Sequence, residues 1–168
     1  VKVNKKIILL ATSPLVEDNF MTKEKYFSKI RRYVKEISSI PNTELIISLH
    51  LREKNISEYQ KITQNLKNVE INNKIDLKKL YSLLNVADLL VFLGAGNIII
   101  EAAIFETPAI SIDLFGDNNP YFSLYKDSKI VLEINPDKSI NQYVKNVLDN
   151  KNIKSKLKRP WKKFIKDC

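Results

Sequence analysis

The 168-residue sequence has one cysteine, one histidine and three glycines. Because the cysteine, Cys168, is the last residue, the sequence offers neither a disulfide framework nor a thiolate metal cluster. Any Ser-His-Asp relay or histidine-based zinc site would have to use His50, the one histidine. This scarcity disfavours hydrolase and zinc chemistry, and the sequence predicts no metal site.

Long apolar runs are also missing. No run approaches the roughly 20 residues with which a helix crosses a membrane, and no signal-peptide pattern is present. These absences predict a soluble, cytoplasmic protein. With 44% hydrophobic residues, the chain is long enough for one domain with a sizeable core. Since the first residue is Val1 rather than methionine, we expect the chain to be a piece of a longer protein.

Positive charge, in contrast, is abundant. Lysine and arginine number 28 against 19 acidic residues, and the net charge is +9. Most of the lysines are scattered, but one dense cluster extends from Lys151 to Lys166, with apolar residues at helical spacing. This pattern is typical of a docked helix with a solvated outer face. It argues against nucleic acid as a partner and leaves open a peripheral contact with a membrane surface.

Apolar runs of strand length alternate with amphipathic helical patterns along the chain. We expect strands at 7–11, 44–49, 69–71, 87–93, 107–112 and 130–132. We expect helices at 22–39, 57–66, 77–84, 98–105 and from Pro136 to 148, followed by the basic C-terminal stretch. This alternation predicts a three-layer α/β, Rossmann-like domain with a mostly parallel six-stranded sheet in the order 3-2-1-4-5-6.

Two of the three glycines lie in the segment Gly94-Ala95-Gly96-Asn97, which follows a buried strand. A strand that ends at Gly-x-Gly and continues as a helix presents backbone N–H groups and a helix N-terminus, which is an arrangement that binds phosphate. Asn97 takes the N-cap position. Glu101, one turn into the helix, is placed to accept hydrogen bonds from a ligand's hydroxyl groups. The alternative is that the glycines only allow tight packing of strand and helix.

Polar residues also follow the first two strands. Thr12 and Ser13 come after the first strand, and His50 and Arg52 come after the second. In the expected strand order, strands 1 and 4 are neighbours across the topological switch point, so Thr12 and Ser13 face the Gly94 loop. We therefore expect a phosphate-containing ligand in this crevice. The alternatives are that the two hydroxyls only cap a turn and that His50 is a structural histidine.

The segment 94–111 resembles the signature region of GT-B glycosyltransferases and UDP-N-acetylglucosamine 2-epimerases. In that region a strand runs into a small-residue loop, then a helix bearing Glu-Ala, then Thr-Pro and another strand. Here the helix carries Glu101-Ala102, and Thr107-Pro108 follows it. The element order of the whole chain is similar to the C-terminal, donor-binding half of those two-domain proteins. The resemblance implies that residues 1–168 form a single nucleotide-sugar-binding domain, the C-terminal half of a longer protein.

The resemblance also implies roles for single residues. The backbone from Gly94 to Asn97 would hold the nucleotide diphosphate, Glu101 would hold the ribose hydroxyls, and the turn at 72–76 would lie beside the base. His50 and Arg52 correspond to a region that contacts sugar or phosphate. GT-B chemistry requires no bound metal or other cofactor. Since catalysis in this superfamily takes place between two domains, the isolated chain is expected to be inactive without an N-terminal acceptor domain, and no catalytic residue is assigned.

Two features depart from the family pattern. Asn97 and Ile98 replace a pair that includes a hydroxyl able to reach the phosphate, and Glu106 replaces the usual glycine after the helix. The leading hypothesis is the nucleotide-sugar-binding half of a glycosyltransferase. The alternatives are a UDP-N-acetylglucosamine 2-epimerase-like domain and a non-catalytic binding module that kept the fold.

Overall fold

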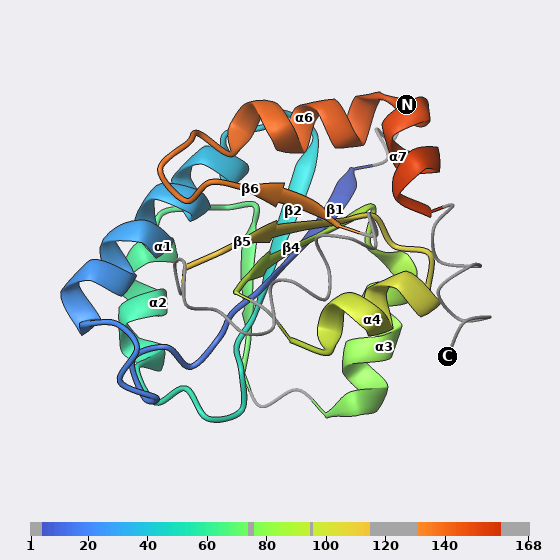
Figure 1. Cartoon of the computed structure of the whole chain (residues 1–168). Coiled ribbons are helices and arrows are strands. Elements are labelled where there is room, and N and C mark those ends of the chain that lie inside the picture. The colour runs from blue at the N-terminus through green and yellow to red at the C-terminus, as the bar shows by residue number, and fades with distance from the viewer. Residues whose placement is uncertain (1–4, 74–75, 95, 115–130, 159–168) are drawn as a thin grey trace.

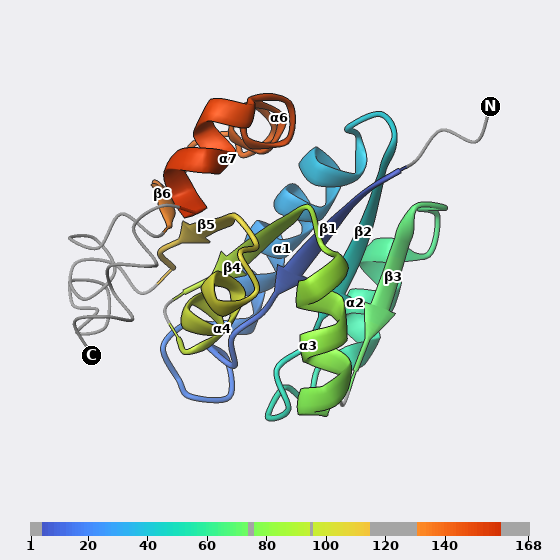
Figure 2. The same ribbon diagram turned by 90° about the vertical axis from the view of Figure 1, so that its right-hand side faces the viewer.

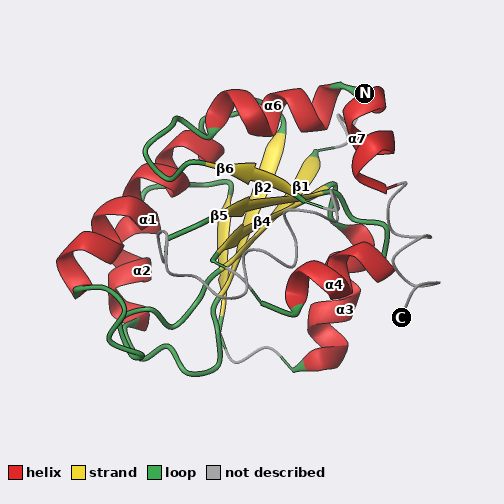
Figure 3. Ribbon diagram, in the orientation of Figure 1, coloured by secondary structure: helices red, strands yellow, loops and turns green. Residues whose placement is uncertain are grey.

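A sheet of six parallel strands carries helices on both faces (Figures 1 and 3). The computed structural model describes residues 5–73, 76–94, 96–114 and 131–158. The strands are β1 (Lys6–Ala11), β2 (Thr43–Ser48), β3 (Val69–Asn72), β4 (Leu89–Leu93), β5 (Ala109–Ile112) and β6 (Leu132–Ile134). The helices are α1 (Lys23–Ser38), α2 (Ile56–Thr63), α3 (Leu77–Val86), α4 (Ile98–Ile104), α6 (Asn141–Asp149) and α7 (Lys151–Lys158). The strand order β3-β2-β1-β4-β5-β6 confirms the predicted Rossmann-like sheet.

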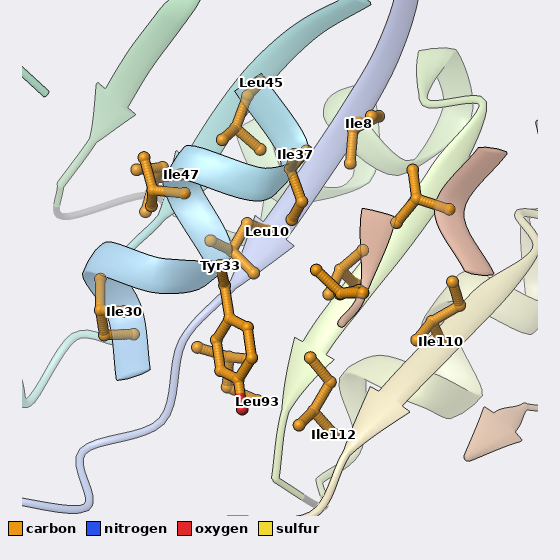
Figure 4. Close-up of a cluster of buried hydrophobic side chains, with 14 of the residues drawn as sticks. Ile8, Leu10, Ile30, Tyr33, Ile37, Leu45, Ile47, Leu93, Ile110 and Ile112 are labelled. Carbon is orange, nitrogen blue, oxygen red and sulfur yellow. The ribbon is translucent and has the colours of Figure 1, made fainter. Parts of the chain in front are cut away.

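Each central strand contributes to two separate core layers, because successive side chains point to opposite faces of a sheet. In β1, Ile8 and Leu10 pack in one layer, while Leu9 and Ala11 pack in the other. The first layer lies under α1, α2 and α6, and Figure 4 shows part of it. The second lies under α3 and α4, which Figure 2 shows on the opposite side of the sheet from α1 and α2. The sheet is therefore buried on both faces, as continuous apolar runs predict.

Local sequence signals set the starts of two helices. The Thr22 hydroxyl accepts a hydrogen bond from the Lys25 main-chain N–H at 3.4 Å and caps α1. The Asp76 carboxylate accepts one from the Lys79 N–H at 2.7 Å and caps α3. Both are N-cap residue types that satisfy free N–H groups in the first turn, so the predicted starts of these helices are confirmed.

Two boundaries near the C-terminus differ from the prediction. The last strand is β6, two residues later than the expected 130–132, and α6 begins at Asn141 rather than at Pro136. The start of α6 is set by α1, where Glu36 Oε2 accepts hydrogen bonds from the N–H groups of Ile140 at 2.6 Å and Asn141 at 3.3 Å. This carboxylate caps α6 from a distant part of the chain. A local sequence pattern holds no signal for such a cap.

Helix α7 opens the basic C-terminal stretch and is docked on the domain. Its apolar residues Ile153 and Leu157 pack against the first core layer. This confirms the docked helix for residues 151–158, while the rest of the basic stretch lies outside the described residues. None of the helices in the described ranges is both long and apolar enough to cross a membrane.

Candidate functional site

The carboxyl ends of four strands form one continuous edge. The register pairs Ala11 of β1 with Phe92 of β4, so the turn at Thr12 starts beside the end of β4. The Thr12 N–H donates to the Ser48 carbonyl at 3.1 Å, and the Gly94 N–H donates to the Ile112 carbonyl at 2.8 Å. These two hydrogen bonds extend the edge to β2 and β5. Between β1 and β4 the strand order reverses, and open α/β sheets bind their ligands at such a switch point.

The loop after β4 needs its glycines for two different reasons. Gly94 has φ 119°, a backbone conformation that side-chain-bearing residues rarely adopt. The Ser111 hydroxyl holds the turn by donating to the Gly94 carbonyl at 2.8 Å. A Cβ on Gly96 would lie 3.3 Å from Phe92 Cζ, so this position serves the close packing of loop and strand. Ala95 lies outside the described residues.

Helix α4 brings Glu101 to the switch-point edge. Asn97 stands at the N-cap position and is exposed, but its side chain forms no cap hydrogen bond. Glu101 is one turn further, half-buried, and burial raises the pKa of its carboxyl. Among the residues that the structure describes, none donates a hydrogen bond to this carboxylate. The Glu101 carboxylate can therefore accept hydrogen bonds from a ligand.

His50 is the second residue after β2, at the same edge, and it is exposed. The Arg52 main-chain N–H donates to His50 Nδ1 at 3.2 Å. Partial burial of the imidazole, followed by the nearby Arg52 charge, lowers the pKa of His50. The imidazole is therefore neutral at pH 7, and since Nδ1 is an acceptor, its proton is on Nε2.

Arg52 and the Thr12-Ser13 turn are tied to the surrounding loops. The Arg52 guanidinium forms a two-point ion pair with Asp18, at 2.5 Å and 2.8 Å. The buried Thr12 hydroxyl donates to Glu53 and accepts from the His50 N–H at 3.1 Å. The carbonyl of Ser13, also buried, shares the single proton of the Tyr26 hydroxyl with Glu53 Oε1, at 3.1 Å and 3.2 Å. The Thr12 hydroxyl thus stabilises the turn after β1, which is the alternative to ligand binding that the sequence left open.

Glu53, which was not among the residues predicted for the site, is the centre of a buried polar cluster. Its Oε1 accepts hydrogen bonds from the hydroxyls of Tyr26, at 3.2 Å, and Tyr59. Its Oε2 accepts from the Thr12 hydroxyl and, at 2.8 Å, from the His50 N–H. Burial raises the pKa of Glu53 and also that of Tyr26. The available signal was the two tyrosines on inward-facing stripes, because a buried phenol hydroxyl needs a partner.

The turn expected beside the base is partly described. Asn72 is buried, and its Oδ1 accepts from the Lys79 ammonium at 2.5 Å. Asp76 caps α3, while residues 74–75 lie outside the described ranges. In the part of the chain that the structure describes, no three or more His, Cys, Asp or Glu residues are grouped so that they could hold a metal ion.

The structure resembles solved proteins that contain a bound nucleoside diphosphate or nucleotide sugar. MnaA from S. aureus, in a co-structure with UDP, matches with a TM-score of 0.72 at 16% identity, over 96% of this chain and 44% of MnaA. The spinosyn rhamnosyltransferase SpnG complexed with thymidine diphosphate matches with a TM-score of 0.72 at 13% identity, over 97% of this chain and 42% of SpnG. UDP-GlcNAc 2-epimerase from Neisseria meningitidis, bound to UDP-GlcNAc, matches with a TM-score of 0.68 at 15% identity, over 99% of this chain and 45% of the epimerase.

The matching structures confirm the expected fold. Nearly all of this chain superposes on them, while it spans less than half the length of each protein. Comparisons with protein-family models and with the sequences of curated proteins gave no match. The chain therefore has the fold of one domain of glycosyltransferases and UDP-GlcNAc 2-epimerases, as the resemblance of segment 94–111 implies.

Proposed function

We propose that this chain is the nucleotide-sugar-binding half of a glycosyltransferase and that it holds a nucleoside diphosphate where β1 and β4 end. The observation that carries the proposal is the placement of Glu101. Its half-buried carboxylate has no donor among the described residues and lies one helical turn beyond the glycine bend at the switch point. The similar structures that contain UDP or thymidine diphosphate cover nearly the whole chain, which supports the same class of ligand.

The residues at this edge have complementary chemistry for such a ligand. The main chain of Gly94 to Asn97 would hold the diphosphate, and the Glu101 carboxylate would accept hydrogen bonds from the ribose hydroxyls. His50 offers an Nε2–H donor and Arg52 a positive charge for a sugar or phosphate group. Fixed N–H groups and positive side chains stabilise a leaving diphosphate electrostatically. The proposed reaction therefore needs no bound metal or other cofactor.

A second domain would complete the enzyme. The chain spans less than half of each matching structure. We therefore expect the isolated chain to bind a nucleotide without turning it over.

A UDP-GlcNAc 2-epimerase-like role is the second candidate. The UDP-GlcNAc 2-epimerase from Neisseria meningitidis and the rhamnosyltransferase SpnG match this chain with similar TM-scores, 0.68 and 0.72. Both roles use the same donor-binding half, so they predict the same ligand at the same edge. Joining the chain to its partner domain and assaying sugar transfer and epimerisation side by side separates them.

A thermal-shift titration with UDP, CDP, GDP, thymidine diphosphate and their sugar conjugates tests the proposal. We expect saturable stabilisation by one nucleotide family, weakened about tenfold in affinity by Glu101→Ala, which corresponds to about 1.4 kcal/mol. Glu106→Ala is the matched control, because Glu106 is an exposed glutamate that follows the other end of α4. Absence of any shift at millimolar nucleotide contradicts the proposal and favours a fold that has lost its binding function.

A further inference from the structure

The Glu53 carboxylate joins four parts of the chain at the edge of the sheet. Its hydrogen-bond donors are the Thr12 hydroxyl after β1, the Tyr26 hydroxyl on α1, the His50 N–H after β2 and the Tyr59 hydroxyl on α2. Glu53 itself is only 8% exposed. The ion pairs of the described residues do not include it. Hydrogen-bond donors, rather than a positive charge, therefore stabilise this buried carboxyl group.

The two oxygens of Glu53 have different tasks. Oε1 accepts from the two tyrosine hydroxyls, which themselves lie 3.1 Å apart, and so anchors the carboxyl group to α1 and α2. Oε2 accepts from Thr12 and from the His50 N–H, and so holds the second residue after β2 against the first residue after β1. Because Thr12 Oγ1 accepts from the same N–H, the His50 main chain is bound at two points.

The His50 side chain is set by the same loop. The Arg52 main-chain N–H donates a hydrogen bond to His50 Nδ1. Glu53 directly follows Arg52 in the same loop. A neutral imidazole with Nδ1 used as an acceptor has Nε2–H left to donate. The position of the His50 Nε2–H thus depends on the main chain of the loop, which Glu53 holds through its hydrogen bond from the His50 N–H.

We propose that Glu53 is a positioning residue, whose buried carboxylate fixes the His50 main chain so that the imidazole Nε2–H binds an anionic group of the ligand. The inference rests on the proposed nucleotide site. It assigns Glu53 no contact with the ligand, and it makes the loop after β2 a prearranged part of the site. Prearranged donors bind more tightly because less ordering of the loop accompanies binding.

Glu53→Gln is the direct test. Glutamine keeps the shape, but an amide presents one acceptor oxygen and one NH₂ group in place of two acceptor oxygens, so at least one pair of donors loses its partner. Since the sequence has one histidine, the imidazole signals in an NMR spectrum belong to His50 alone. We expect Glu53→Gln to shift these signals and to weaken UDP binding about tenfold. Glu58→Gln, a glutamate exchange in the first turn of α2, leaves both unchanged.

A second pair of variants covers the case in which Glu53→Gln does not fold. Thr12→Val removes the hydroxyl that contacts both Glu53 and His50, and Thr12→Ser retains it. We expect Thr12→Val to shift the His50 signals and to weaken UDP binding, and Thr12→Ser to restore both. A merely structural Glu53 would lower the melting temperature in these variants without moving the His50 signals or the affinity.

The outcomes separate the two proposals. If the unmodified chain binds no nucleotide, both proposals fail. If it binds UDP, and Glu53→Gln or Thr12→Val leaves the affinity and the His50 signals unchanged, only the positioning role of Glu53 is overturned.

Discussion

Asp18 and Arg52 form a two-point ion pair between the loops that follow β1 and β2, with Oδ1–Nη1 at 2.5 Å and Oδ2–Nη2 at 2.8 Å. The Arg52 side chain is 62% exposed, and the Asp18 side chain is 25% exposed. Planar guanidinium groups bind carboxylates and phosphates through the same paired N–H groups. In the proposed site, a ligand phosphate would therefore compete with Asp18 for Arg52.

Removal of the competing carboxylate is predicted to favour the ligand. Asp18→Asn leaves Arg52 without its ionic partner, so UDP affinity rises about threefold by the added positive potential. Because exposed ion pairs contribute little, the free energy of unfolding falls by less than about 1 kcal/mol. Calorimetric titration and chemical denaturation measure the two effects. Asp137→Asn, which alters an exposed pair with Lys29, is the control, and weaker UDP binding by Asp18→Asn contradicts this account of Arg52.

The two glycines of the site loop are predicted to respond differently to alanine. Gly94→Ala places a Cβ on a backbone with φ 119°, and such strain destabilises a fold by about 1–3 kcal/mol. Gly96→Ala brings a Cβ to 3.3 Å from the Phe92 ring, which is a close contact that a small side-chain shift relieves. Denaturant unfolding should rank Gly94→Ala as the less stable variant. The reverse order would show that packing, rather than the turn, requires the glycines.

Glu106 is predicted to be a position where a substitution by glycine stabilises the fold. It has φ 54° at the end of α4, where the N–H of Glu106 donates to the Ala103 carbonyl at 2.9 Å and that of Thr107 to Ala102 at 2.8 Å. This is the Schellman arrangement, whose left-handed residue is usually glycine. Glu106→Gly should raise the free energy of unfolding by about 1 kcal/mol. Glu106→Ala, which retains a Cβ, should give no such gain, and an equal gain would refute the backbone explanation.

His50 is predicted to make stability depend on pH. Its pKa in the folded chain is lowered, so the unfolded chain, with a histidine pKa near 6.5, binds the proton more tightly. The free energy of unfolding therefore falls as the pH decreases through about 6.5, until the pH is below the folded pKa. His50→Gln removes this term, so its loss of stability between about pH 7.5 and about pH 5.5 is smaller. An NMR titration that gives His50 a midpoint above about 6.5 would be inconsistent with this prediction.

Much of the fold could be predicted because the signals for it are local. The apolar run that contains β4 indicated a strand buried on both faces, and Asp76 marked the start of α3. The start of α6 could not be predicted, because its cap is Glu36 on α1. Local patterns also place β6 poorly, since only three residues form it.

The candidate site was predictable in its position but not in its internal contacts. Strand order alone placed Thr12 and Gly94 at one edge, which the parallel register of β1 and β4 supports. The pattern of α1 marked Tyr26 as an inward-facing residue whose hydroxyl needs a partner, but it held no signal that this partner is Glu53. The pairing of Arg52 with Asp18 likewise depends on how two loops meet in space.

The most direct test of the account is an NMR titration of this chain with UDP that follows assigned main-chain amides. The account predicts saturable shifts at Gly94, Gly96 and Asn97, together with a shift of the His50 imidazole, and no comparable shifts in α6. Shifts that saturate only at other positions, such as the groove lined by Lys78, Tyr81, Ser82, Asn85 and Phe105, would contradict it. So would a spectrum that millimolar UDP leaves unchanged.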